Sequence, residues 1–99
     1  SNHKQALYTV DIQSKDLVVF PLSCIANISC HITHVNIDHN RISQLPAKIS
    51  EQLPLLEVFT ASGNELSFLP DDFGELLLLK ELCLCDNNLE LLPDSLSKP

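Results

Sequence analysis

The sequence predicts an α/β solenoid, with short parallel strands on a concave face and short helical or 3-10 segments on the convex side. The first observation is a repeat, because asparagines recur at Asn40, Asn64 and Asn87, 24 and 23 residues apart. The second is the strand-like alternation of leucine-type and other residues just before each asparagine. Self-similarity at a period of about 20 to 50 residues is typical of chains that stack small repeated units.

The three copies share apolar positions on both sides of the asparagine. Those before it are Ile32, Val35 and Ile37 in one copy, Leu56, Phe59 and Ala61 in the next, and Leu79, Leu82 and Leu84 in the third. Those after it are Ile42, Leu45 and Ile49, then Leu66, Leu69 and Phe73, then Leu89, Leu92 and Leu96. A proline follows the middle residue of the second group each time. We expect these positions, Leu82 and Leu84 included, to face a shared core.

A fourth, degenerate copy precedes these three. The same frame recovers Leu7, Val10, Ile12, Leu17, Phe20 and Pro21, but it places Lys15 where the asparagine belongs. An asparagine amide can satisfy backbone groups where the chain leaves a strand, whereas a lysine side chain has no acceptor. We therefore predict one domain over residues 1–99 with about four repeats, at 7–31, 32–55, 56–78 and 79–98, of which the first is irregular.

Each repeat must return the chain to the same place, so the strands are expected to be parallel and about 4.8 Å apart. The return segments near residues 47–53 and 71–77 are expected to form short helical or 3-10 turns. Asp71 and Asp72 are expected to start the second of these turns, because acidic residues favour helix N-termini.

The segments "ITHVNIDHNRISQLP", "LEVFTASGNELSFLP" and "LCLCDNNLELLP" carry a pattern that resembles the leucine-rich repeat family. The Leu-Pro ending and the period of about 23 residues resemble the subclass found in cytoplasmic scaffold and signalling proteins and in some bacterial effectors. The resemblance implies a horseshoe-shaped protein-interaction module. It also implies a cytoplasmic location, or delivery into a host cytoplasm, although a leader removed earlier would leave no trace and secretion stays open.

Charge and hydropathy exclude two classes of partner. The formal net charge is -7 with only 6 lysines and arginines, so no basic cluster is available to neutralise phosphates and we expect no nucleic acid. The longest apolar runs, at 17–20 and 76–79, are far shorter than the roughly 20 residues that span a bilayer, so we expect no membrane contact.

The outward strand positions are the candidate binding surface, because polar recognition surfaces in solenoids lie on the concave sheet. We call this set the concave face, and it comprises His34, Asn36, Asp38, His39, Val58, Thr60, Ser62, Glu81, Cys83, Cys85 and Asp86. The sequence predicts a non-catalytic module that binds a protein partner there. Charge reversal at Asp38 or Glu81 is expected to abolish capture while leaving unfolding nearly unchanged.

Three alternatives stay open. In the first, the concave face is merely solvated and the partner binds elsewhere. In the second, the chain is a targeting or substrate-recognition segment of a larger enzyme, scaffold or bacterial effector. The third is self-association through the repeat ends, where Leu89, Leu91 and Leu96 are expected to be poorly covered.

No catalytic, cofactor or metal site is predicted. Cys83 and Cys85 lie two apart on a strand, which is poor disulfide geometry, and they supply only two of the four ligands of a closed zinc site. The histidines of the concave face lie two strands away, too far for a catalytic pair, and are expected to be surface contacts. Cys24 is expected to be buried in place of an aliphatic residue, while Cys30 is undecided and a bridge between these two stays open.

Overall fold

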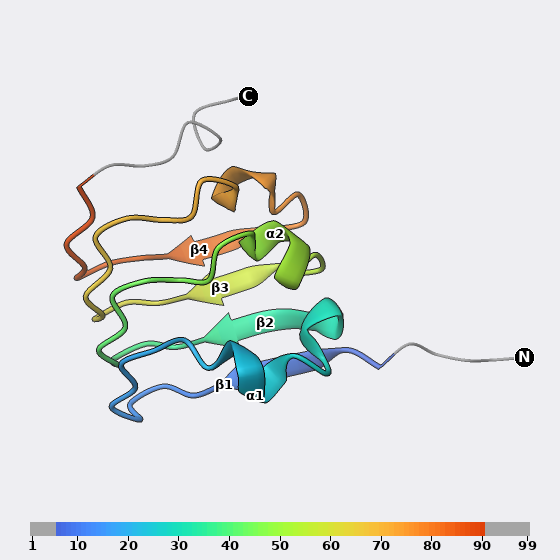
Figure 1. Cartoon of the computed structure of the whole chain (residues 1–99), viewed down its shortest axis with the longest axis horizontal. Coiled ribbons are helices and arrows are strands. Elements are labelled where there is room, and N and C mark those ends of the chain that lie inside the picture. The colour runs from blue at the N-terminus through green and yellow to red at the C-terminus, as the bar shows by residue number, and fades with distance from the viewer. Residues whose placement is uncertain (1–5, 91–99) are drawn as a thin grey trace, which may run out of the picture.

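The computed structural model describes residues 6–90, which form a parallel sheet with short helices behind it (Figure 1). The strands are β1 Tyr8–Asp11, β2 Ile32–Asn36, β3 Val58–Thr60 and β4 Glu81–Cys83. Their order is β1-β2-β3-β4, and every neighbouring pair is parallel. The sheet order therefore follows the chain, as it must when each repeat adds one strand beside the last. The predicted leucine-rich repeat solenoid is confirmed.

Short helical segments follow the strands, as expected. They are α1 Leu22–Ile25, the 3-10 turn η1 Ser29–His31, α2 Ile49–Gln52 and the 3-10 turn η2 Phe73–Glu75. The predicted turns near 47–53 and 71–77 are thus confirmed. Helix α2 lies against η1 and η2 of the adjoining repeats, so the convex segments form their own stack behind the sheet. Within residues 6–90, no helix combines the length and apolar character needed to cross a membrane.

The strand register reproduces the columns read from the sequence. Val10 pairs with Val35, Val35 with Phe59, and Phe59 with Leu82. Alternation then puts these side chains on the inner side of the sheet. The first pair of strands carries an irregularity between Tyr8 and Thr9, in the repeat that the sequence marks as degenerate.

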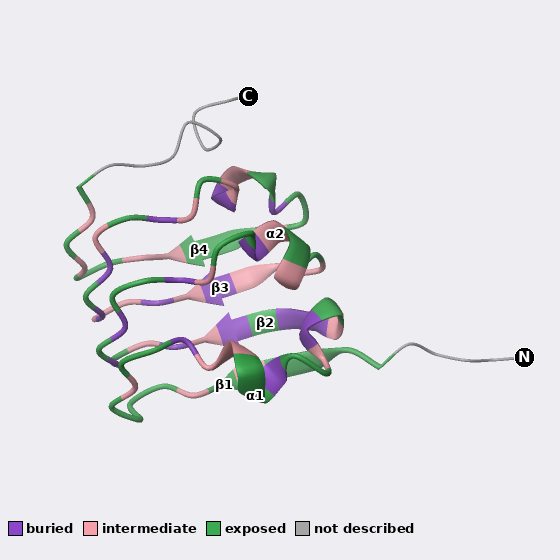
Figure 2. Cartoon of the chain, viewed as in Figure 1, coloured by how far each residue is buried: buried purple, intermediate pink, exposed green. Residues whose placement is uncertain are grey.

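The core lies between the sheet and the return segments and is densest in the middle repeats. Phe59, from the strand, and Phe73, from the convex turn, are both fully buried, and their rings meet edge to face at 5.9 Å between centroids. Figure 2 shows buried residues recurring along the central strands and return segments, whereas β1 and β4 are largely exposed. Each repeat thus depends on both neighbours for burial, and within residues 6–90 the outer strands β1 and β4 have only one.

The inward leucines of β4 are less buried than predicted. Leu82 is 40% exposed and Leu84 is half-buried, although both follow the inner column. Within the described residues, β4 has a neighbouring strand on one side only, namely β3. The last residues of the predicted repeat 79–98 lie outside the described residues. Leu82 therefore follows the inner column as expected, but the core does not enclose it.

The anchor asparagines carry out the predicted backbone capping. Asn64 Oδ1 accepts from the backbone N–H of Ile42 at 3.1 Å, and its Nδ2 donates to the carbonyls of Ile37, Ala61 and Ser62 at 2.9, 3.1 and 3.3 Å. Each anchor reaches back to the preceding repeat in this way, so the amides form a ladder. The anchors at 40 and 64 are buried, and the one at 87 is half-buried.

The degenerate first repeat is completed by the second. Asn40 Oδ1 accepts from the backbone N–H groups of Lys15 and Leu17 at 2.9 and 3.0 Å. Its Nδ2 also donates to the carbonyl of Ile12 at 3.0 Å. These backbone groups are therefore hydrogen-bonded although position 15 carries no asparagine, because Asn40 of the next repeat bonds to them.

Candidate functional site

The outward strand positions form continuous columns across the sheet. His34 pairs with Val58, and Val58 with Glu81, while Asn36 pairs with Thr60, and Thr60 with Cys83. None of the residues of the concave face is buried: the exposed ones are His34, His39, Glu81, Cys85 and Asp86, and the half-buried ones are Asn36, Asp38, Val58, Thr60, Ser62 and Cys83. The structure thus brings the predicted residues together on one accessible surface.

A run of hydrogen bonds crosses three repeats on this face. Asn36 Oδ1 accepts from the backbone N–H of Asp38 at 2.9 Å, and Asp38 Oδ1 accepts from the backbone N–H of Ser62 at 2.8 Å. Ser62 Oγ lies 3.0 Å from Cys83 Sγ, which lies 3.7 Å from Cys85 Sγ. Asp38 is therefore part of the scaffold as well as of the surface, because its carboxylate ties one repeat to the next.

Every turn after a strand begins with a left-handed residue. The residues just before the anchor position, Ser14, His39, Gly63 and Asp86, have φ of 56°, 58°, 70° and 56°. Glycine fits this conformation without strain. At position 63 it also avoids a clash, because an added Cβ would lie 2.7 Å from Nδ1 of the His39 ring. The imidazole therefore covers the glycine and is held at the rim of the face.

The two thiols of the concave face differ electrostatically. The pKa of the Cys83 thiol lies below its ordinary value because the Ser62 hydroxyl, and then the backbone N–H of Cys85, hydrogen-bond to its sulfur. The pKa of the Cys85 thiol is raised by its hydrogen bond with Cys83 and by the negative charge that Cys83 acquires. Cys83 is therefore the first of the pair to ionise.

The concave face holds no assembled catalytic or zinc constellation. Among residues 6–90, no three histidine, cysteine or acidic side chains come close enough to share a metal ion. His34 Nδ1 lies 2.8 Å from the hydroxyl of its neighbour Thr33, and strand β3 separates its strand from the thiols. The Thr60 hydroxyl oxygen is buried without a hydrogen-bond partner in the described part of the chain.

The prediction for Cys24 is wrong. Cys24 is exposed, and the neighbouring Ile25 is buried in its place, because α1 turns the chain by one position relative to the later repeats. Cys30 is also exposed, and both thiols are free, so they form no bridge.

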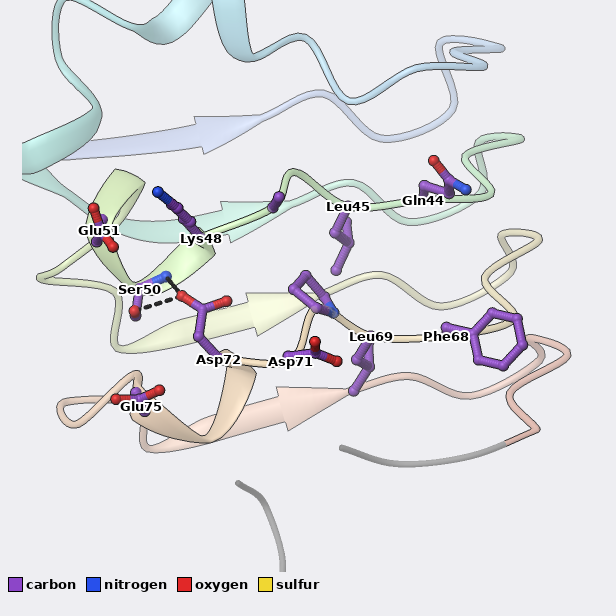
Figure 3. A pocket seen from close by; sticks show the side chains of 12 residues that line it. Gln44, Leu45, Lys48, Ser50, Glu51, Phe68, Leu69, Asp71, Asp72 and Glu75 are labelled. Carbon is purple, nitrogen blue, oxygen red and sulfur yellow. Dashed lines mark hydrogen bonds between the residues drawn. The ribbon is translucent and has the colours of Figure 1, made fainter. Parts of the chain in front are cut away.

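The acidic pair precedes the second convex turn as expected, but the carboxylate of Asp72 makes a different contact from a helix cap. Asp72 occupies the N-cap position of η2 but makes no side-chain cap there. Its carboxylate instead accepts from the backbone N–H and the hydroxyl of Ser50 at 2.8 and 2.5 Å, at the first turn of α2 in the preceding repeat (Figure 3). Burial by itself raises the pKa of Asp72, but the hydrogen bonds from Ser50 outweigh it and lower the pKa.

Sequence reasoning missed a groove of about 570 Å³ between the return segments of the second and third repeats. Figure 3 shows it running from the turns that carry Glu51 and Glu75, past Leu45 and Leu69, to Phe68. Phe68 is 55% exposed despite its size. The sequence signal was a large apolar residue, Phe68, at the position that the polar Gln44 holds in the repeat before.

Comparisons with known proteins agree with this architecture. A mouse protein, geranylgeranyl transferase type-2 subunit alpha, is 39% identical over 69 residues, which cover 64% of this chain and 12% of that protein. Mouse leucine-rich repeat and calponin homology domain-containing protein 1 is 45% identical over 51 residues, covering 52% of this chain and 7% of that protein. The chain therefore spans about an eighth or less of these relatives.

A chain in the crystal structure of the BIR3–SERK2 complex from Arabidopsis thaliana superposes with a TM-score of 0.70 at 29% identity, covering 88% of this chain and 47% of that one. The family model described as leucine rich repeat matches residues 30–89, which include three of the four strands. Members of this family are typically non-catalytic modules for protein–protein interaction. The chain belongs to the leucine-rich repeat family.

Proposed function

We propose that the chain is a non-catalytic recognition module that binds a protein partner across the concave face. The observation that carries the proposal is the continuity of this surface. Parallel strands align the outward residues in columns, and none of them is buried. The structural neighbour, which comes from a complex of two proteins, is consistent with this use.

The chemistry of the face suggests what the partner presents. Val58 is a small apolar spot between His34 on one side and Glu81 on the other. Acidic residues border the same region at Asp38 and Asp86, and the chain as a whole carries a net charge of -7. A partner segment with a basic residue beside a small apolar one matches this arrangement, because charges at an interface are complementary.

The best probe of this face is Glu81, whose side chain is exposed and makes no ion pair with another described residue. Asp38 is a poor probe, because its carboxylate holds the backbone N–H of Ser62. We expect Glu81→Lys to weaken the partner's affinity by about tenfold or more, since like charge at a contact costs at least about 1.4 kcal/mol. Glu90→Lys is the matched control, because it makes the same charge change away from the sheet face.

The experiment begins with affinity capture from lysate and identification of the partner by mass spectrometry. Binding of that partner is then measured for the chain, Glu81→Lys, Glu90→Lys and Glu51→Lys, which alters the groove behind the sheet. Loss of binding in the first variant alone supports the concave face. Loss in the Glu51 variant with full binding by the Glu81 variant would move the site to the groove.

A second candidate is that the chain is a substrate-recognition or targeting segment of a larger enzyme. The similarity to geranylgeranyl transferase type-2 subunit alpha favours it, because that protein is part of an enzyme and the match covers only 12% of it. On this reading, affinity capture retains another subunit of a prenyl transferase. Capture that repeatedly yields no enzyme subunit argues against this candidate and leaves the first one standing.

Two expectations complete the proposal. Self-association would use the repeat ends, where Leu82 and Leu7 are exposed, although Leu89 is half-buried against the core and Leu91 and Leu96 lie outside the described residues. Sedimentation that finds a monomer over a wide concentration range removes this idea. A cytoplasmic location, or delivery into a host cytoplasm, is tested by fractionation of the cells that make the protein.

A further inference from the structure

The groove between the return segments of the second and third repeats has two unlike ends. Its volume is about 570 Å³, and its lining comes from the segments 44–51 and 68–75, so it is separate from the concave face. Figure 3 shows Phe68 at one end and the acidic side chains of the turns at the other, with Leu45 and Leu69 between them. The groove therefore offers an apolar contact and a charged contact side by side.

The apolar end combines buried leucines with an exposed aromatic ring. Leu45 and Leu69 keep only 8% and 6% of their surface exposed, and they line the groove where the two segments meet. Phe68 is 55% exposed, so much of its ring faces water. A bulky apolar side chain laid along this ring would remove apolar area from water on both partners, which is favourable.

The apolar surface continues on the far side of the same return segment. A second groove, of about 380 Å³, lies between the first and second repeats and shares Gln44, Leu45 and Ala47 with the first groove. Val18 and Val19 line it and are 55% and 73% exposed. Exposed apolar residues thus recur on neighbouring return segments, and contiguous apolar surface of this kind marks interaction sites more often than scattered single residues do.

The other end of the groove is acidic. Four carboxylates line it, those of Glu51, Asp71, Asp72 and Glu75, against the one ammonium group of Lys48. Glu51 and Glu75 are exposed, so a bound group can reach them without disturbing the core. This end therefore attracts basic side chains and repels phosphate groups, whether these belong to nucleic acids or to acidic lipids.

The two ends together select the kind of occupant. A second copy of this chain would bring a net charge of -7 to an acidic groove, which opposes self-docking. A protein segment that joins basic to apolar side chains matches both ends. We propose that the groove is a second docking site, independent of the concave face, for a short partner segment with basic residues at one end and bulky apolar residues at the other.

The test is a titration of the isotope-labelled full chain, followed by nuclear magnetic resonance, with two acetylated and amidated peptides. Their sequences are Trp-Leu-Gly-Arg-Arg and the reverse, so that both chain directions are covered. We expect one of them to shift the backbone amides of residues 44–51 and 68–75, with an affinity that falls as salt screens the charges. Matched peptides with glutamate in place of arginine should bind about tenfold more weakly or worse.

Substitutions at each end separate the two contacts. Phe68→Gln should weaken binding of the arginine peptide by about tenfold, because the apolar contact is lost. The double variant Glu51→Lys, Glu75→Lys should weaken it by about tenfold and remove most of the salt dependence, since exposed charge pairs are individually weak and two are reversed. The matched controls should bind as the parent does. They are Leu77→Gln, at an 88% exposed apolar residue outside the groove lining, and Glu81→Lys on the concave face.

Four results would overturn the proposal. They are no shift with either arginine peptide, equal binding of the glutamate peptides, loss of binding in Glu81→Lys, which would place the peptide on the concave face, and self-association that Phe68→Gln abolishes, which would make a second copy the occupant. Circular dichroism checks that each variant is folded. None of these results tests the proposed partner binding, which is measured separately with the captured partner and Glu81→Lys.

Discussion

The anchor asparagines offer the strongest test of how the stack is held together. Asn64→Ala removes one accepted and three donated hydrogen bonds. Two of the lost partners, the N–H of Ile42 and the carbonyl of Ile37, belong to the preceding repeat and to fully buried residues. An alanine leaves the Ile42 N–H without a partner in a place that water does not readily reach, whereas the Ile37 carbonyl keeps the hydrogen bond that it accepts from Asn40 Nδ2 at 2.9 Å.

The expected cost follows from the unsatisfied N–H of Ile42 and from the three donated hydrogen bonds that are lost. One buried polar group left unsatisfied costs about 1 to 3 kcal/mol, and the three lost donated bonds add about 0.5 to 1.5 kcal/mol each. We therefore expect Asn64→Ala to lower the free energy of unfolding by about 3 to 5 kcal/mol, a large part of the roughly 5 to 15 kcal/mol of a typical domain. With a urea slope of about 1.5 kcal/mol/M, the unfolding midpoint falls by roughly 2 to 3 M.

The assay is urea unfolding followed by circular dichroism, with two comparison variants. Asn87→Ala makes similar losses at a half-buried position, so water replaces part of them and the cost is smaller. Asn88→Ala changes an exposed asparagine next to it and should shift stability by less than about 0.5 kcal/mol. Equal midpoints for the Asn64 and Asn88 variants would show that the amide ladder does not hold the repeats together.

Three further outcomes are expected. Phe59→Ala removes a fully buried ring and should lower the free energy of unfolding in urea by about 3 to 5 kcal/mol. Leu82→Ala should cost less than half of that, because Leu82 is 40% exposed. A larger loss for Leu82→Ala than for Phe59→Ala would refute the register. Gly63→Ala should lower the free energy of unfolding by at least about 1 kcal/mol, since φ is 70° and the new Cβ meets Nδ1 of His39 at 2.7 Å. In a double-mutant cycle, adding His39→Ala should recover part of this loss. Asp72 has a pKa below its ordinary value of 3.8, so its stabilising contribution is present above that pH and is lost as the pH falls through the lowered pKa. Asp72→Asn should therefore reduce the loss of unfolding free energy that is measured as the pH falls from 6 to 2.

Much of the fold could be predicted because the repeat couples side-chain pattern to backbone path. An asparagine at a fixed distance from inward leucines marks where the chain leaves a strand, and alternation then assigns each side chain to a face. The pairings of His34 with Val58 and of Val58 with Glu81 follow from that alone. The outward residues of the candidate site were accessible to the same reasoning, although their binding role stays a proposal.

The features that escaped prediction depend on contacts between repeats. Cys24 was assigned to the core by counting from Lys15, but α1 in the first return segment places Ile25 inward instead. The bond from Asp72 to Ser50 links segments 22 residues apart, and no local capping rule indicates it. The groove that contains Phe68 likewise exists only once two return segments lie side by side.

The concave face cannot be treated as a layer that is separable from the scaffold. Asp38 offers a charge to a partner, but its Oδ1 also holds the backbone N–H of Ser62, whose hydroxyl lies 3.0 Å from Cys83 Sγ. The sequence-based expectation that reversing the charge of Asp38 leaves unfolding unchanged is therefore at odds with the structure. A lysine there leaves the Ser62 N–H without its acceptor, so weaker binding by such a variant reports lost order as well as lost charge. Glu81 and Asp38 variants measured side by side separate the two effects, because only the Asp38 variant should also unfold at lower urea.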